Sequence, residues 1–288
     1  MEADVYLPDR VECAPVVMWI HGGALIFGSR REITAMHLEG LLESGYAVVS
    51  VDYRLAPETK LPDLFTDIET AYNWIRSVGL NLWGVDTERI GIVGQSAGGY
   101  LSLLAGQRLR PRPSAVIALY GYGDVSGSWY SEPDPHYCSE PHVHGGEARR
   151  LVGSSTVKDA PGISRIPFYI YCRQRGRWPL EVAGPELASD ADALAAWCPV
   201  FNVDGRTSPT LLIHGDNDTD VPYGESVRMA RALARAGRTQ EFITIPRGSH
   251  GFDQNPADPA SRLAVGKVVA FLGEHVKRQK AENHLASP

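Results

Sequence analysis

The sequence has few cysteines, no long apolar run and no excess of basic residues. Its 288 residues include four cysteines with no C-x-x-C pair, so their spacing indicates neither a zinc site nor a disulfide framework. Lys and Arg number 28 against 34 Asp and Glu, which gives a formal net charge of −6 and no basic footprint for nucleic acid. No apolar run approaches the roughly 20 residues that a membrane-spanning helix requires. We therefore expect a globular chain that binds no nucleic acid and spans no membrane.

The first residues also lack the pattern of a secretion signal. Met1–Pro8 contains no basic stretch followed by an apolar core. Because the scattered cysteines are interpreted as reduced thiols, we expect a cytoplasmic protein. Hydrophobic residues make up 43% of the chain, which is enough for a substantial core.

Strand-like and helix-like segments alternate along most of the chain. Short apolar runs predict strands, and apolar positions three and four residues apart predict helices. The predicted strands are residues 16–20, 46–51, 90–93, 115–119, 210–213 and 240–245, and the predicted helices are residues 63–77, 99–105, 227–234 and 263–276. This alternation predicts an α/β fold, with a mostly parallel central sheet and helices on both faces.

One long segment breaks this alternation. Residues 124–202 separate two predicted strands and are rich in proline, glycine, histidine and aromatic residues. Long excursions of this kind are usually lids or binding loops. We therefore predict a single domain over residues 1–288 with an inserted cap at about 124–202; the alternative is a structural insertion with a small core of its own. His136, His142 and His144 lie there, but no carboxylate or thiol spacing supports a metal site, and no cofactor is expected.

The most informative motif is Gly94–Gly98, which reads Gly-Gln-Ser-Ala-Gly and directly follows a predicted strand. In a G-x-S-x-G turn between a strand and a helix, the glycines allow the sharp bend that lifts the serine out of the sheet. Ser96 then lies at the positive end of the following helix, which favours negative charge. This context favours Ser96 as a nucleophile over an ordinary glycine-rich turn.

A serine hydroxyl becomes a good nucleophile only when a base takes its proton. His250 follows the last predicted strand in a glycine-flanked loop, and Asp218 follows the strand before it. The carboxyl ends of parallel strands meet at one edge of a sheet, so the order Ser96, Asp218, His250 predicts a catalytic triad there. Asp216 and Asp220 compete with Asp218 for the role of the acid. If Asp218 holds that role, we expect the other two to brace the turn through Asx-type hydrogen bonds.

Acyl transfer also needs hydrogen-bond donors for the oxyanion that develops on the attacked carbonyl. His21–Ala24 reads His-Gly-Gly-Ala and follows a predicted strand, so its small residues leave backbone N–H groups unobstructed. We predict that Gly22 and Gly23, with Ala97 after the nucleophile, form an oxyanion hole of two or three donors. Loss of one such donor typically costs about 2.7–4 kcal/mol of transition-state stabilisation.

Together these motifs resemble the α/β-hydrolase fold, and most closely its esterase/lipase branch related to hormone-sensitive lipase. The resemblance covers about residues 14–124 and 208–271 and includes Asp52–Glu58, which we interpret with Asp67 as structural residues beside the site. It implies a serine hydrolase that cleaves a carboxylic ester with the triad and oxyanion hole named above. The aromatic-rich segment favours a small hydrophobic or aromatic substrate.

The sequence departs from this family at two points. The family usually has a third glycine where Ala24 stands, and the added methyl group is expected to narrow the acyl pocket. The chain reaches its His-Gly-Gly turn by residue 21, which leaves no room for the family's N-terminal cap. Residues 124–202 are therefore expected to replace that cap.

Other functions fit the same residues. An aryl formamidase or amidase of this fold also has a His-Gly-Gly turn without an N-terminal cap. A lactonase, deacetylase or cyclase that acts on a natural product suits the aromatic-rich segment. A ligand-binding member that has lost catalysis usually lacks a triad residue, and here none is missing. The sequence leaves the acyl and alcohol specificity and the oligomeric state open.

Overall fold

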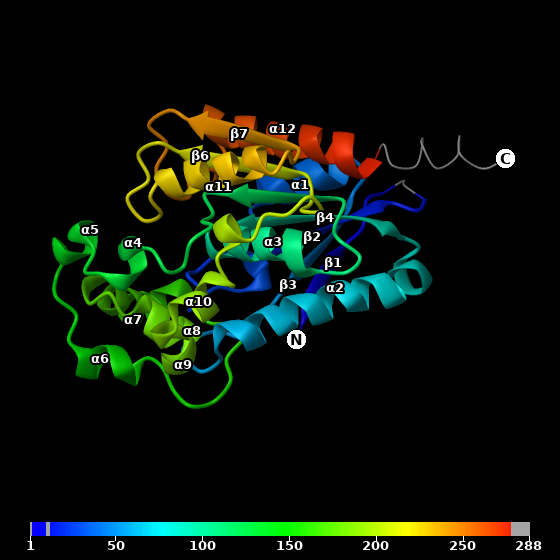
Figure 1. Ribbon diagram of the computed structural model, residues 1–288. Helices are drawn as coiled ribbons and strands as arrows, with labels where there is room; N and C mark the ends of the chain where they lie inside the picture. The colour runs from blue at the N-terminus through cyan, green and yellow to red at the C-terminus, as the bar shows by residue number, and fades with distance from the viewer. Residues whose placement is uncertain (1, 10–11, 278–288) are drawn as a thin grey trace.

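A seven-stranded sheet forms the centre of the computed structural model, which describes residues 2–9 and 12–277 (Figure 1). Its strands are β1 (Ala3–Tyr6), β2 (Pro15–Ile20), β3 (Ala47–Val51), β4 (Asp86–Gln95), β5 (Ala115–Leu119), β6 (Thr210–Gly215) and β7 (Gln240–Ile245). They follow the order β1-β3-β2-β4-β5-β6-β7, and all neighbouring pairs are parallel except β1 with β3. The mostly parallel sheet is confirmed, and β1 is an antiparallel edge strand that the apolar pattern did not predict.

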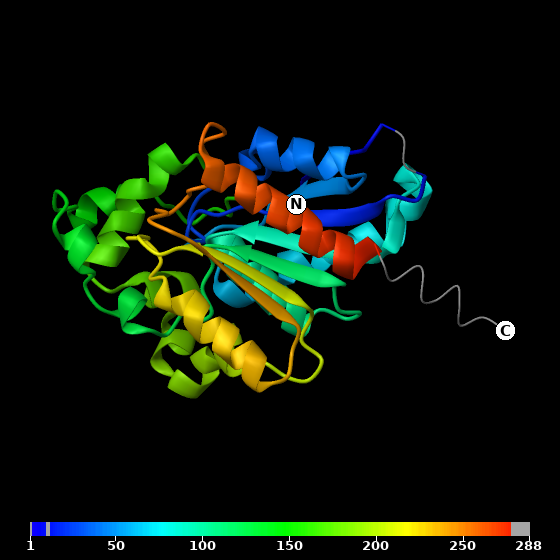
Figure 2. The same ribbon diagram turned by 90° about the horizontal axis from the view of Figure 1, so that it is seen from above.

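Helices cover both faces of the sheet (Figure 2). One face carries α1 (Ala35–Glu43) and α12 (Pro259–Leu272), and the other carries α2 (Leu61–Trp83), α3 (Ala97–Arg108) and α11 (Gly224–Arg235). A buried cluster lies on each face of the sheet. Strand β2 contributes to both clusters, because successive side chains of a strand point to opposite faces. Val16, Met18 and Ile20 pack with α2 and α3. Val17 and Trp19 pack with α1 and α12.

Helix α2 is longer than the predicted helix 63–77. Pro62 lies in its first turn, where a missing N–H is tolerated, and Asp63 lies near the positive end of the helix. Gly84 ends it in a left-handed conformation with φ of 67°, and its N–H donates to the carbonyl of Leu80. Within the described part of the chain, no helix is long and apolar enough to cross a membrane.

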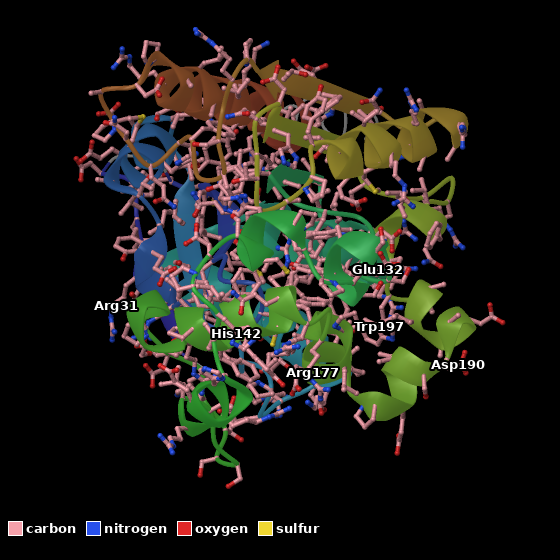
Figure 3. All side chains as sticks on the ribbon, turned by 90° about the vertical axis from the view of Figure 1, so that its left-hand side faces the viewer. Arg31, Glu132, His142, Arg177, Asp190 and Trp197 are labelled. Atoms are coloured by element: carbon pink, nitrogen blue, oxygen red, sulfur yellow. The ribbon has the colours of Figure 1, made fainter. Side chains whose placement is uncertain are left out.

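Residues 124–202, called the insertion from here on, leave the sheet after β5 and return before β6. They form α4 (Ser128–Ser131), α5 (Pro135–Cys138), α6 (Gly145–Arg150), α7 (Gly162–Gln174), α8 (Trp178–Ala183), α9 (Pro185–Ser189), α10 (Ala191–Ala195) and the 3₁₀ turn η2 (Pro199–Phe201). These helices lie beyond the carboxyl ends of the strands, and Figure 3 views the molecule from that side. Phe168 and Trp178 belong to the same buried cluster as side chains of α2 and α3. These side chains of the insertion therefore share a buried cluster with the helices of the sheet.

Ion pairs hold the Asp52–Glu58 stretch to its surroundings. Glu58 accepts hydrogen bonds from the buried guanidinium of Arg165 in the insertion, at 2.6 and 3.0 Å. Asp67 accepts from the Nε of Arg54 at 2.8 Å and from its backbone N–H at 2.9 Å. These contacts fit the structural interpretation of this stretch and fasten the insertion to the loop after β3.

Candidate active site

Ser96 lies in the sharp turn between β4 and α3. Its φ of 53° and ψ of −118° are strained for a residue with a side chain. A Cβ on Gly94 would lie 2.1 Å from the carbonyl oxygen of Gly98, and a Cβ on Gly98 would lie 2.1 Å from that of Ile20. Neither position therefore accepts a larger residue, which is the physical reason for both glycines of the motif.

The structure brings the three predicted triad residues together. The Oγ of Ser96 lies 3.0 Å from the Nε2 of His250, and the Nδ1 of His250 lies 2.7 Å from the Oδ2 of Asp218. Each residue follows the carboxyl end of a strand, β4, β7 and β6 respectively. An ionised carboxylate only accepts hydrogen bonds, so Nδ1 donates to Asp218 and leaves Nε2 free to accept the proton of Ser96.

The carboxylate of Asp218 is held by four donors. Its Oδ1 accepts from the backbone N–H groups of Asp220 at 2.8 Å and Val221 at 2.9 Å. Its Oδ2 accepts from His214 at 3.1 Å as well as from His250. Burial alone raises the pKa of Asp218, but the hydrogen bonds from both histidines outweigh burial and hold this pKa well below its usual range. Asp218 is therefore an oriented and ionised partner for the base.

The imidazole of His250 lies in an acidic environment. Burial lowers its pKa, but the carboxylates of Asp220 and Asp218 more than compensate, so the pKa is raised above its ordinary value of 6.5. The ring of Tyr120 packs against the imidazole at a centroid distance of 4.7 Å. Its hydroxyl donates to Asp253 at 2.8 Å, which fixes the position of the ring. The base thus has both a defined orientation and a stabilised charged form.

The His-Gly-Gly-Ala turn lies beside the nucleophile. A Cβ on Gly22 would lie 3.3 Å from the Cβ of Ser96. Within residues 2–9 and 12–277, the N–H groups of Gly22 and Gly23 donate to no backbone carbonyl or protein side chain. Ala97 begins α3, where a backbone N–H has no partner inside the helix. The three predicted donors are therefore available to a ligand next to Ser96.

The carbonyl groups of this turn are held from the opposite side. The hydroxyl of Tyr53 donates to the carbonyls of His21 and Gly22, both at 3.1 Å, and its ring stacks on the imidazole of His21. The indole of Trp178, in the insertion, donates to the carbonyl of Ala24 at 3.0 Å. The sequence placed Tyr53 in the structural Asp52–Glu58 stretch beside the site but gave no indication of the role of Trp178. The turn is therefore fixed before any substrate binds, which is what an oxyanion hole requires.

The two competing aspartates do not occupy the place of the triad acid. Asp216 accepts the backbone N–H of Arg247 at 2.5 Å and so links the loops after β6 and β7. Asp220 accepts hydrogen bonds from Tyr169 and Arg173 of the insertion. The prediction that Asp216 and Asp220 brace their own turn through Asx-type bonds is wrong, because Asp216 binds the loop after β7 and the insertion supplies the partners of Asp220. Asp218, which lies between them in the sequence, makes the Asx-type bonds instead.

A cleft of about 630 Å³ opens over Ser96. Apolar surface in the cleft includes Phe27 and Met36. Asp220 and Asp253 contribute carboxylates, and no Lys or Arg is found among the described residues that line it. The cleft therefore offers apolar contact and hydrogen-bond acceptors, and its negative charge disfavours an anionic substrate.

No metal site accompanies this cleft within the part of the chain that the structure describes, where no three His, Cys, Asp or Glu side chains lie close enough to hold an ion. In the insertion, the rings of His142 and His144 lie 4.8 Å apart, and His142 pairs with Arg175. His136 packs against Tyr137.

Comparisons with known proteins concern the fold of this chain. The BD-FAE family model matches residues 3–113, and the model of the prolyl oligopeptidase family matches residues 176–279. An α/β-hydrolase superfamily protein from Enterococcus faecalis is 22% identical and superposes with a TM-score of 0.73 over 94% of each chain. The chain has the α/β-hydrolase fold. EstE1, a carboxylesterase cloned from a metagenomic library, is 25% identical to this α/β-hydrolase, with a TM-score of 0.69 over 95% of this chain and 84% of EstE1.

This α/β-hydrolase is also similar to segments of much larger proteins. It is 27% identical over 301 residues to Preu3, a non-reducing polyketide synthase of Preussia isomera. This alignment covers 87% of the chain. The chain spans only 12–15% of the length of the curated synthases that it matches. The matches therefore concern one segment of those synthases. The family models and the solved esterases agree with the esterase branch that the sequence motifs resemble.

Proposed function

We propose that this α/β-hydrolase is a serine hydrolase that cleaves a carboxylic ester through an acyl-enzyme. The observation that carries the proposal is the continuous hydrogen-bond chain from Ser96 through His250 to Asp218. It lies beside backbone N–H groups that have no protein partner within the described residues. Ser96, His250, Gly22 and Gly23 line one cleft, which supports this assignment of roles.

The proposed reaction begins when His250 takes the proton of Ser96 and the Oγ attacks the ester carbonyl carbon. The N–H groups of Gly22, Gly23 and Ala97 then stabilise the oxyanion. The bond to the leaving alcohol breaks, and His250 gives its proton to the departing oxygen. Water then attacks the acyl-enzyme with the same base, which releases the carboxylic acid and restores Ser96.

We further propose that the insertion is a cap over this site within a single domain. Its Tyr169 lines the cleft, and its Trp178 holds the oxyanion turn. Its position beyond the carboxyl ends of the strands suits a cover for the substrate. The apolar and aromatic lining favours a small, neutral ester with a hydrophobic or aromatic part.

The substitution Ser96→Ala tests the proposal with p-nitrophenyl acetate as the substrate. We expect kcat to fall by about 10⁴-fold or more, because the remaining oxyanion donors and substrate binding supply only residual catalysis. A fluorophosphonate probe should label the unchanged protein at Ser96 and should not label the variant. Ser189→Ala, on the exposed surface of the insertion, is the matched control and should keep full activity. Full activity of Ser96→Ala would exclude the proposed nucleophile.

The matches to polyketide synthases favour a second candidate, a lactonase, deacetylase or cyclase that acts on a natural product with the same residues. A panel of p-nitrophenyl esters from acetyl to decanoyl, with a lactone and an aryl formamide, separates these activities. A preference for the formamide would identify a formamidase. A protein that only binds a ligand would hydrolyse none of them and would take up no fluorophosphonate.

A further inference from the structure

A second carboxylate faces the base of the proposed triad. The Oδ2 of Asp220 lies 3.4 Å from the Nε2 of His250, and the same nitrogen lies 3.0 Å from the Oγ of Ser96. Asp218 binds the other ring nitrogen, Nδ1, at 2.7 Å. His250 therefore has a carboxylate at each ring nitrogen, whereas a triad requires only the one at Nδ1.

The insertion fixes the orientation of Asp220. The Oδ1 of Asp220 accepts from the hydroxyls of Tyr137 at 2.9 Å and Tyr169 at 2.5 Å. It also accepts from the Nη1 of Arg173 at 2.8 Å, and the same nitrogen donates to the backbone carbonyl of Asp220 at 3.1 Å. Three donors on Oδ1 leave Oδ2 to face His250.

Arg173 is a fully buried cation whose charge is more than balanced. Its Nη2 donates to Asp134 at 2.6 Å, and the rings of four aromatic residues of the insertion surround its guanidinium at 4.7–5.6 Å. When Asp134, Arg173 and Asp220 are all ionised, the three groups carry a net charge of −1. A proton on His250 neutralises this remaining charge.

We propose that Asp220 is a second counter-ion for His250 during the reaction, and that the buried cation Arg173 offsets part of the charge of Asp220. This inference rests on the proposed function. In the resting site, Nε2 presents a lone pair to the hydroxyl of Ser96, and a carboxylate gains little from that lone pair. After the proton moves to Nε2, Asp220 attracts the imidazolium, so it stabilises the transition state more than the resting state.

Several other groups face His250, and the test has to leave them unchanged. Asp218 lies on the loop after β6, Tyr120 follows β5, and Asp253 lies on the same loop as His250. Asp253 already accepts from the hydroxyl of Tyr120 and from the side-chain amide of Gln95 at 2.9 Å. Only Asp220 receives its charge balance from the insertion.

The substitution Asp220→Asn keeps the shape of the side chain and removes its charge. The acid limb is the part of the pH profile in which kcat/KM falls toward low pH as His250 becomes protonated. With p-nitrophenyl acetate as the substrate, we expect this limb to move to lower pH by about one unit, because a neighbouring charge shifts a pKa by about 1–3. This is the low end of that range, since 22% of the Asp220 side chain is exposed to solvent. We also expect kcat on the plateau to fall about tenfold, since the imidazolium loses a counter-ion. Arg173 keeps Asp134 as its partner in this variant, so the fold should survive.

Asp216→Asn is the matched control. It makes the same chemical change two residues before Asp218, but its carboxylate binds the backbone N–H of Arg247 and not His250. We expect its acid limb to coincide with that of the unchanged protein. The pH dependence of fluorophosphonate labelling at Ser96 gives a second readout that does not depend on ester turnover.

The charge of Arg173 predicts a shift in the opposite direction. Arg173→Gln leaves Asp134 and Asp220 without a cation, so the acid limb should move to higher pH, and Arg173→Lys should return it toward the original position. A general loss of stability would not produce opposite shifts in Asp220→Asn and Arg173→Gln. If Arg173→Gln does not fold, Tyr169→Phe removes another donor from the same oxygen and must shift the limb in the same direction.

An acid limb of Asp220→Asn that coincides with that of the unchanged protein overturns the inference. That result leaves the proposed function intact as long as Ser96→Ala is inactive. Activity of Ser96→Ala would instead refute the proposed function, whatever Asp220→Asn does. Shifts of Asp220→Asn and Arg173→Gln in the same direction would exclude the charge-balancing role of Arg173.

Discussion

Glu225, in the first turn of α11, is a buried carboxylate that should make the stability of this protein depend on pH. Its Oε1 accepts from Arg228 at 3.0 Å, while its Oε2 is buried without a partner among the described residues. Asp124 binds the same guanidinium at 2.9 Å, so two carboxylates share one cation. Burial, followed by repulsion from Asp124, outweighs the attraction of Arg228 and raises the pKa of Glu225 to about 7.

The direction of the effect follows from this raised pKa. The ordinary value is 4.5, so the folded chain binds the proton of Glu225 more tightly than the unfolded chain does. The resulting stabilisation is fully present below about pH 4.5 and is lost as the pH rises through about 7. A pKa difference of about 2.5 between the two states corresponds to about 3 kcal/mol of unfolding free energy.

Urea unfolding of the unchanged protein and of Glu225→Gln, at pH 5 and pH 9, measures this contribution. The amide stays neutral at both values, so the difference in unfolding free energy between the two proteins should change by about 3 kcal/mol in favour of the variant at pH 9. Glu241→Gln is the control, because 43% of the Glu241 side chain is exposed to solvent and its ion pair with Lys267 contributes little. A difference between the unchanged protein and Glu225→Gln that is the same at both pH values would refute the reasoning.

Three further predictions concern the site. Because the pKa of His250 is raised above 6.5 and the base must be neutral, kcat/KM should fall as the pH drops through this raised value; a flat profile from pH 5 to 8 would contradict this. Trp178→Phe removes the donor to the carbonyl of Ala24. We expect urea unfolding to show a stability about 1–3 kcal/mol lower, and kcat/KM to fall about tenfold because the oxyanion turn is misplaced. An unchanged kcat/KM would show that the turn does not depend on Trp178. Gly94→Ala places a Cβ 2.1 Å from the carbonyl oxygen of Gly98, and we expect a loss of about 3 kcal/mol or more in thermal unfolding; an unchanged Tm would exclude the close contact.

The sequence predicted those parts of the fold that local patterns determine. All six predicted strands are present. Five contain buried apolar runs, which is typical of parallel strands, and β7 is the half-buried exception. The edge strand β1 was missed, since its four residues are only half-buried and carry no such run. The helices of the insertion were also missed. Most have four to six residues and are stabilised by contacts with distant residues, which no local periodicity records.

The site shows the same division. Ser96, Asp218 and His250 were identified because each stands in a recognisable loop after a strand. Tyr53 and Trp178 were not identified as supports of the oxyanion turn, because nothing around them in the sequence indicates which carbonyl they bind. Asp220 was assigned a local role for the same reason, since its partner Arg173 lies 47 residues away in the chain.

The place of each strand in the sheet has a consequence for heat inactivation. Strand β4, which leads into Ser96, has three strands on either side, whereas β7, which leads into His250, is an outermost strand with one neighbour and mostly half-buried residues. Fraying of a sheet starts from its margins, so β7 detaches at a lower temperature than β4. We therefore expect gentle warming to remove the imidazole of His250 from a serine that is still in place, so that the proposed hydrolysis stops before the bulk of the molecule melts.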